Sequence, residues 1–132
     1  MLSDSKCVAT VATADIPAAR SFYVETLGLT PRVADDNALG FILADGSSLM
    51  VYHRPEHKAP ENTVVTFVVG DTRAEVADLR GRGVTFEDYD QPGLKTVDGI
   101  AADDEGGTMA WFKDPAGNIL GVMQMPAVEP AP

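Results

Sequence analysis

The fold is decided by two stretches that match each other, VATVATADIPAARSFYVETLGLT at residues 8–30 and VVTFVVGDTRAEVADLRGRGVTF at residues 64–86. With Val8 placed on Val64, Thr10 falls on Thr66 and Asp15 falls on Asp71. An internal match of this kind indicates that one supersecondary unit occurs twice in the chain.

Each copy predicts a strand followed by a helix. The first part of each copy is rich in β-branched residues, which is typical of strands. Asp15 and Asp71 come next, where an aspartate can cap the first turn of a helix. Gly28 and Gly83 follow the helical segments and suit the position just after a helix end.

Three further strand-like runs follow each predicted helix. They are LTPRV (29–33), ALGFILA (38–44) and SLMVYH (48–53) in the first copy, and VTFED (84–88), TMAWFKD (108–114) and ILGVMQM (119–125) in the second. The order βαβββ therefore occurs twice. We predict an α+β fold of paired βαβββ modules, which form a curved, half-open mixed sheet with helices on the outer face.

The predicted organisation is one domain, residues 1–125, with a first module at about 6–54 and a second at about 62–125. The Pro-containing end, 126–132, has the composition of a flexible tail.

Composition limits the partners. The chain has 132 residues, 45% of them hydrophobic and 23% charged, as in an ordinary globular domain. The net charge of −10 disfavours nucleic acid and anionic membranes as partners. No apolar stretch is long enough to span a membrane, and the first residues lack the pattern of a signal peptide, so we predict a cytoplasmic protein. The single cysteine, Cys7, is predicted to be a buried, inert thiol of the first strand.

Three motifs resemble the vicinal oxygen chelate superfamily, which includes glyoxalase I, extradiol dioxygenases and the bleomycin, mitomycin and fosfomycin resistance proteins. The motifs are ADIPAARSFYVETLGL (14–29), VVTFVVGDTRAEVADLRGRGV (64–84) and WFKDPAGNILGV (111–122). The resemblance covers residues 7–125 and implies the paired-module fold. It does not by itself imply an activity, because this fold carries many functions.

The resemblance also implies where a metal would bind. Metal-dependent members hold the ion with a His or Glu from each of four strands, and the matching positions here are Val8, Met50, Val64 and Gly121. None of these side chains can ligate Zn²⁺, Ni²⁺, Fe²⁺ or Mn²⁺. We therefore predict no metal and no other cofactor. Gly121 is interpreted as a space that admits part of a ligand; the alternative is a glycine needed for close strand packing.

His53 and His57, in HRPEH, could suggest a second metal site. Pro55 between them opposes the helix that would place both imidazoles on one face, so we predict a solvated loop. The sequence contains no GxSxG elbow or phosphate-binding glycine loop.

The strand period of two predicts a ligand-binding face with aromatic and methionine side chains. Matching the repeats sets Trp111 opposite Phe41, with Phe112 pointing the other way. The segment 89–107 is expected to pass over this face, where it could act as a lid. The predicted ligand-binding residues are Phe41, Met50, Tyr52, Val64, Thr66, Tyr89, Pro92, Leu94, Met109, Trp111, Gly121 and Met123.

These features predict a metal-independent homodimer that sequesters a bulky, partly aromatic small molecule, most readily a bleomycin-, mitomycin- or enediyne-like antibiotic, and so confers resistance. Two alternatives stay open. The first is a lyase, isomerase or epimerase whose acid–base residue is not identified. The second is a structural or regulatory dimer whose cavity is filled by its own side chains.

Overall fold

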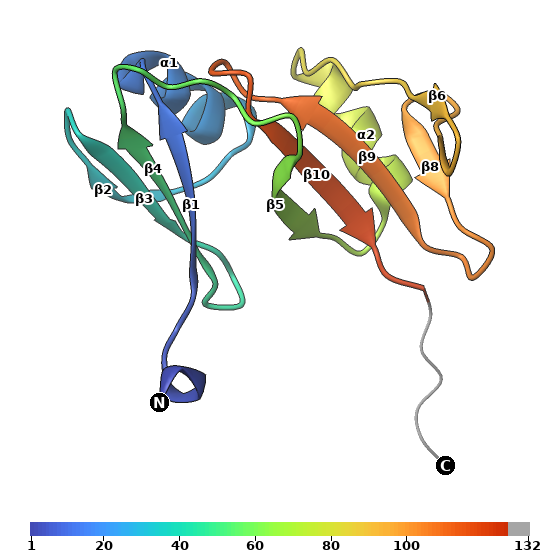
Figure 1. Cartoon of the computed structure of the whole chain (residues 1–132), viewed down its shortest axis with the longest axis horizontal. Helices are drawn as coiled ribbons and strands as arrows, with labels where there is room; N and C mark the ends of the chain where they lie inside the picture. The colour runs from blue at the N-terminus through green and yellow to red at the C-terminus, as the bar shows by residue number, and fades with distance from the viewer. Residues whose placement is uncertain (127–132) are drawn as a thin grey trace. The chain divides into compact units, whose positions relative to one another are not determined.

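The computed structural model describes residues 1–126 and resolves into two compact units (Figure 1). Unit 1 consists of Met1–Pro60 together with Asp114–Asn118. Unit 2 consists of Glu61–Lys113 and the chain from Ile119 onward. The predicted tail at 126–132 lies outside the described residues except for Pro126. None of the helices in residues 1–126 is long and apolar enough to cross a membrane.

Unit 1 has a four-stranded sheet in the order β1-β4-β3-β2. The strands are β1 (Val8–Thr13), β2 (Pro31–Ala34), β3 (Ala38–Ile42) and β4 (Ser48–His53), and a short 3-10 turn, η1 (Leu2–Asp4), precedes them. β1 runs parallel to β4, and the other pairs are antiparallel. Cys7 lies just before β1 and is exposed, so the prediction of a buried strand thiol was wrong. The strand begins one residue later, where the chain joins the sheet.

The helix of unit 1 begins where the sequence predicts. Asp15 Oδ1 accepts a hydrogen bond of 3.0 Å from the backbone N–H of Ala18, which caps α1 (Ile16–Arg20). The helix then widens into a π-helical stretch, η2 (Ser21–Thr26). Gly28 follows the end of this stretch, and its φ of 77° places it in the left-handed region that favours glycine.

Unit 2 repeats this plan. Its strands are β5 (Thr63–Val68), β8 (Ile100–Ala102), β9 (Thr108–Lys113) and β10 (Ile119–Gln124), in the sheet order β5-β10-β9-β8. The helix α2 (Thr72–Gly81) is capped by Asp71 and contacts β9 and β10 (Figure 1). Two mixed four-stranded sheets, each with its helix, confirm the predicted α+β fold of βαβββ modules.

The edge of the second sheet differs from the prediction. Residues 84–88 were expected to form a full strand, but only Phe86 forms a bridge there, to Phe112. The edge resumes at β8, which pairs with the other end of β9. Between the two pieces lies a hairpin of β6 (Asp90–Gln91) and β7 (Leu94–Lys95). The long connection is therefore a hairpin inserted into an edge strand.

Buried hydrogen bonds hold the turn between β9 and β10 within unit 1. The Tyr23 hydroxyl donates to Asp114 Oδ2 at 2.7 Å, and both residues are buried. Asn118 Nδ2 donates to the same Oδ2 at 2.9 Å and to the carbonyl of Ala12 at 2.8 Å. The DPAGN turn is thus a structural element of the fold.

Candidate functional site

The four positions at which the family would hold a metal carry no metal ligand. Val8 and Met50 are 50% and 37% exposed on the first sheet. Val64 is half-buried in β5, and Gly121 lies in the middle of β10. None of these residues offers a nitrogen, oxygen or thiolate donor. Within residues 1–126, no three or more His, Cys, Asp or Glu side chains gather as a metal site. The chain therefore does not fit the family's metal.

Gly121 occupies the centre of the open face of the second sheet, the face opposite α2. It pairs with Thr66 of β5 on one side and Trp111 of β9 on the other. A Cβ at this position would lie 3.5 Å from Thr66 Oγ1, 3.6 Å from Thr63 Cγ2 and 3.6 Å from Trp111 Cδ1. These are ordinary van der Waals separations, so the packing of the strands does not require glycine here. Gly121 is buried, and it places no side chain of β10 between Thr66 and the indole of Trp111.

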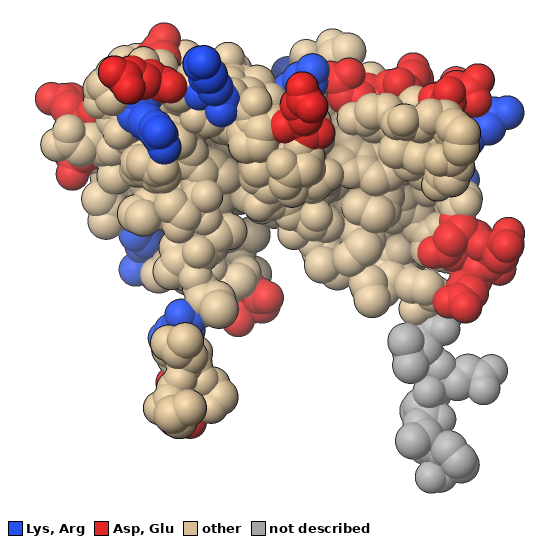
Figure 2. All heavy atoms as spheres, viewed as in Figure 1, with Lys and Arg blue, Asp and Glu red and all other residues tan. Residues whose placement is uncertain are grey.

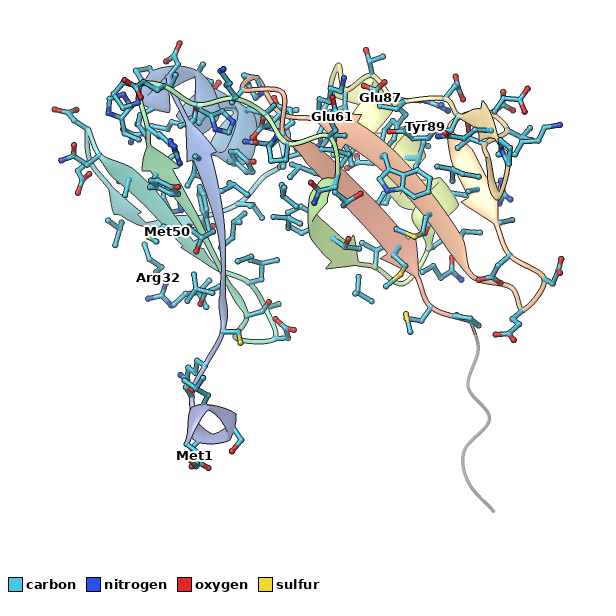
Figure 3. The ribbon with its side chains drawn as sticks, in the orientation of Figure 1. Met1, Arg32, Met50, Glu61, Glu87 and Tyr89 are labelled. Carbon is cyan, nitrogen blue, oxygen red and sulfur yellow. The ribbon has the colours of Figure 1, made fainter. Side chains whose placement is uncertain are left out.

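Trp111 and Tyr89 contact each other. Their ring centroids are 5.5 Å apart and their planes are inclined by 86°, an edge-to-face arrangement. Both side chains are half-buried. Figure 3 shows Tyr89 and Glu87 alongside β9, and Figure 2 shows this face of unit 2 as largely uncharged over β9 and β10, with acidic side chains at its margins. The two rings form an aromatic corner that a flat ligand can contact.

Charge at the edge of the corner comes from Glu87 and Lys113. Lys113 Nζ lies 4.0 Å from Glu87 Oε1, and the two side chains are 52% and 34% exposed. The backbone N–H of Glu87 donates to the carbonyl of Trp111 at 2.8 Å, which places the backbone of Glu87 next to that of Trp111. Burial, and then the negative charge of Glu87, raise the pKa of Tyr89, so its phenol stays protonated and neutral at neutral pH.

The predicted ligand-binding residues of unit 2 lie either on the strands β5, β9 and β10 or in and beside the β6–β7 hairpin. Met109 and Met123 face each other across β9 and β10 and are half-buried, and Thr66 is exposed beside Gly121. Pro92 lies exposed in the turn of the β6–β7 hairpin, and Leu94 is half-buried in β7. The structure thus brings Thr66, Met109, Trp111, Gly121 and Met123 together on neighbouring strands, and Tyr89 joins them through its contact with Trp111.

In β5 the pairing register shifts by one residue, because Thr63 pairs with Ile119 and Val65 with Leu120. Val64 is the extra residue of this bulge. The bulge brings the methyl group of Thr63 toward Gly121, although a strict alternation would have assigned that role to Val64. Thr63 is a site residue that the sequence analysis missed, since a bulge leaves no reliable signal in a single sequence.

The open face of the first sheet is apolar. Met50 pairs with Thr10 and Gly40, and Tyr52 pairs with Ala12 and Ala38. A hollow of about 250 Å³ lies there; Val8, Val33, Ile42 and Met50 contribute to its lining, and Arg32 is its one cationic residue (Figure 3). Tyr52 is half-buried, so both Met50 and Tyr52 are available to a ligand on this face.

The predicted place of Phe41 was wrong. Phe41 is 2% exposed, and its ring centroid lies 6.0 Å from that of Tyr23 in the core. Phe41 pairs with Leu49 as Phe112 pairs with Leu120, so the counterpart of Trp111 in the first sheet is Gly40. The match of Phe41 with Trp111 is therefore shifted by one residue. In a strand, a shift of one residue moves a side chain to the other face of the sheet.

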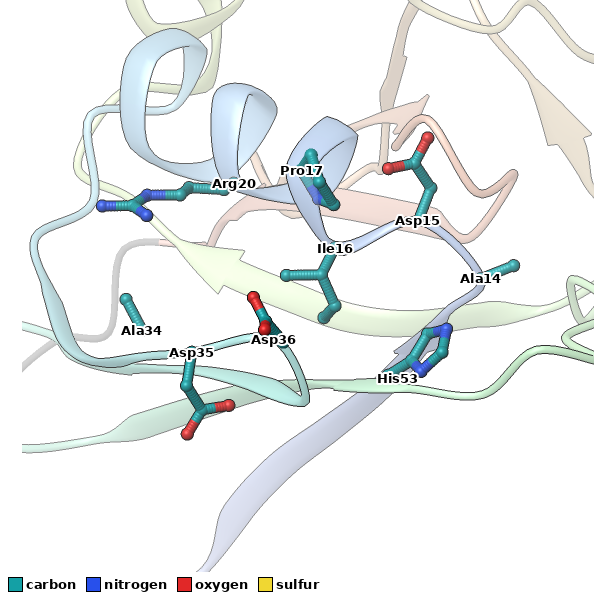
Figure 4. A pocket seen from close by; sticks show the side chains of 9 residues that line it. All are labelled: Ala14, Asp15, Ile16, Pro17, Arg20, Ala34, Asp35, Asp36 and His53. Atoms are coloured by element: carbon teal, nitrogen blue, oxygen red, sulfur yellow. The ribbon is translucent and has the colours of Figure 1, made fainter.

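A second hollow, of about 490 Å³, lies at the start of α1 (Figure 4). Arg20, Asp35, Asp36 and His53 contribute polar groups to it. His53 is the last residue of β4, as the run SLMVYH predicts, and its side chain is exposed. His57 does lie in the following connection, where its Nε2 is 3.0 Å from Asn118 Oδ1. His53 therefore lines the hollow at the start of α1, whereas His57 contacts Asn118.

The chain has two βαβββ modules, and the four positions at which the family would hold a metal carry side chains that cannot ligate one. The comparisons identify its family. The model of the Glyoxalase/Bleomycin resistance protein/Dioxygenase superfamily matches residues 7–122. The chain belongs to this superfamily. No curated protein matches the chain.

Solved structures share the fold at low identity. A glyoxalase/bleomycin resistance protein from Catenulispora acidiphila is 24% identical, with a TM-score of 0.70 over 92% of this chain and 98% of that one. A glyoxalase family protein from Enterococcus faecalis is 20% identical, with a TM-score of 0.71 over 93% and 99%. A bleomycin resistance determinant encoded on the transposon Tn5 is 19% identical, with a TM-score of 0.69 over 91% and 97%. These likenesses establish the fold.

Proposed function

We propose that this protein binds a bulky, partly aromatic small molecule without a metal and sequesters it. The observation that carries the proposal is the pairing of Gly121 in β10 with the half-buried Trp111 in β9. A glycine stands where the family would hold a metal ligand, so no side chain of β10 covers the half-buried indole of Trp111 at this point. A flat ring can contact the indole there.

The surrounding side chains support a binding role. Met109 and Met123 flank the corner of Trp111 and Tyr89 with flexible, polarizable thioethers, which adapt to ligands of irregular shape. Thr66 adds a hydroxyl group, and Thr63 a methyl group, at the other edge of the glycine. The candidate ligand is an antibiotic of bleomycin, mitomycin or enediyne type, and sequestration would confer resistance by keeping the compound from its target.

The proposal includes a homodimer in the cytoplasm. Each unit exposes apolar side chains on its sheet, with Val8 and Ile42 about half exposed in unit 1 and Val68 65% exposed in unit 2. Exposed apolar surface of this kind favours association. A second copy of the chain is the simplest partner that could cover it.

Tryptophan fluorescence tests the binding proposal at the site itself, because Trp111 is the only tryptophan of the chain. Titration with metal-free bleomycin, mitomycin C and an anthraquinone-type enediyne should change the emission of Trp111 in a saturable way for at least one compound. The Gly121→Leu variant should lose the response, while a Gly70→Ala variant, changed in a loop where a Cβ meets nothing within 4 Å, should keep it. A saturable response that Gly121→Leu leaves unchanged would contradict this site.

The enzyme alternative has one structural point in its favour. The hollow at the start of α1 brings the carboxylate of Asp36 and the imidazole of His53 to one cavity, and such groups can transfer protons. It predicts that a bound compound is converted, and that Asp36→Asn or His53→Gln abolishes the conversion. Return of the compound with an unaltered mass favours sequestration instead.

A further inference from the structure

Near the aromatic corner of unit 2, formed by Trp111 and Tyr89, lies the acidic residue Glu87. An acidic residue near aromatic rings favours a ligand that carries a positive charge. The rings of Trp111 and Tyr89 stand at 86° to each other with centroids 5.5 Å apart, and both side chains are half-buried, so part of each ring is accessible to a ligand. Ring faces carry negative electrostatic potential and attract cations, and an ammonium is held best where it contacts such a face with an anion nearby.

Glu87 supplies the anion. Its backbone N–H is bonded to the Trp111 carbonyl, and Glu87 lies two residues before Tyr89 in the chain. Its charge reaches the phenol, since it contributes to the raised pKa of Tyr89. The side chain is one third exposed, which leaves the carboxylate open to a ligand.

The cation already near Glu87 is held loosely. Lys113 Nζ lies 4.0 Å from Glu87 Oε1, at the outer limit of an ion pair, and the lysine side chain is about half exposed. Exposed pairs of this kind contribute little stability. A ligand cation that also contacts two rings can therefore displace the lysine into water.

Resting on the proposed binding function, we propose that the corner formed by Trp111, Tyr89 and Glu87 recognises an alkylated ammonium group of the ligand. The bound compound then combines a flat apolar part, placed against the indole beside Gly121, with a basic or quaternary nitrogen at the corner. The net charge of −10 attracts such compounds at long range, and the corner selects among them at contact.

The test compares two probes of one shape, choline and 3,3-dimethylbutan-1-ol, which differ in charge at the branched end. The protein has one indole N–H, so its NMR cross-peak is that of Trp111 and reports binding directly. We expect choline to shift this peak with a dissociation constant lower than that of the neutral alcohol by on the order of fivefold, the effect of one cation–π contact.

Variants separate the contributions. Glu87→Gln and Tyr89→Leu should each remove the preference for choline, while Tyr89→Phe should keep it because the ring remains. Lys113→Met should strengthen choline binding by removing the competing ammonium. Glu75→Gln is the matched control; it removes the same charge from α2, on the opposite face of the sheet, and should change nothing.

Equal shifts by choline and the neutral alcohol, or a preference for choline that survives Glu87→Gln, would overturn the ammonium corner. If the larger aromatic compounds still change Trp111 emission in that case, the proposed binding function stands and only the corner fails. If neither the small probes nor the aromatic compounds perturb Trp111, both proposals are wrong.

Discussion

The hydroxyl of Tyr23 donates a 2.7 Å hydrogen bond to Asp114 Oδ2, across 91 residues of sequence. Tyr23 is fully buried, and Asp114 is 5% exposed. The bond ties the helix of the first module to the turn between the last two strands. The turn's position therefore depends on a residue of the first repeat.

Replacing Tyr23 with phenylalanine should lower the free energy of unfolding by roughly 1–3 kcal/mol, because a buried carboxylate loses a hydrogen-bond donor. Urea denaturation followed by circular dichroism measures the change. Tyr52→Phe is the control, because the Tyr52 hydroxyl makes no hydrogen bond within residues 1–126 and should change stability little. Equal losses in both variants would show that the Tyr23 bond has no special role.

The same phenol should make the protein sensitive to alkali. Burial, and then the charge of Asp114 and the hydrogen bond to it, raise the pKa of Tyr23 well above its ordinary value. At a pH above about 10, the unfolded chain loses this proton while the folded chain keeps it. The free energy of unfolding should then fall by up to about 1.4 kcal/mol per pH unit from this group.

Tyr23→Phe should reduce this alkaline slope, measured by urea denaturation between neutral and alkaline pH. Stability from the Tyr23 proton is fully present below the unfolded pKa and is lost as the pH rises. A slope that is the same in the variant and the natural sequence would contradict the assignment to Tyr23.

Gly121→Ala should fold and bind as the natural protein does, because the added Cβ meets neighbours at 3.5–3.6 Å. Gly121→Leu should abolish ligand binding. Gly121 is buried, but its Cβ position meets neighbours only at 3.5–3.6 Å, so we expect the free energy of unfolding to change by less than about 1 kcal/mol. Thermal unfolding and Trp111 fluorescence measure the two effects. A loss of about 1–3 kcal/mol for the leucine variant would instead indicate a filled, tightly packed interior.

Removing divalent metals should leave ligand binding unchanged, because Val8, Met50, Val64 and Gly121 cannot ligate them. Titration of Trp111 fluorescence before and after dialysis against EDTA measures this directly. Binding that disappears with chelation and returns with Zn²⁺, Mn²⁺ or Fe²⁺ would show that a metal is held by other residues.

The sequence predicted the architecture well because its strongest signals are local. Strand runs, the aspartates that cap α1 and α2, and the glycines after the helices occur in the same order in both copies, and each depends on its own segment of chain. The capping bonds of Asp15 and Asp71 confirm this directly.

The site was less predictable because it depends on register. Trp111 pairs with Gly121, as the strand that contains it predicts, whereas Phe41 lies in the core because the repeat alignment is one residue out in β3. Thr63 was missed because a bulge at Val64 interrupts the alternation. The contact of Tyr89 with Trp111 depends on a hairpin inserted in the edge strand, a tertiary feature that no local pattern specifies.

Native mass spectrometry of the protein with metal-free bleomycin, mitomycin C and an enediyne compound tests the central claim most directly, since subunit number, bound metal and ligand mass are read together. The account predicts a metal-free dimer that retains at least one of these compounds with its mass unaltered. A bound metal ion, or a compound whose mass has changed, would contradict metal-free sequestration, and a changed mass would favour the enzyme alternative.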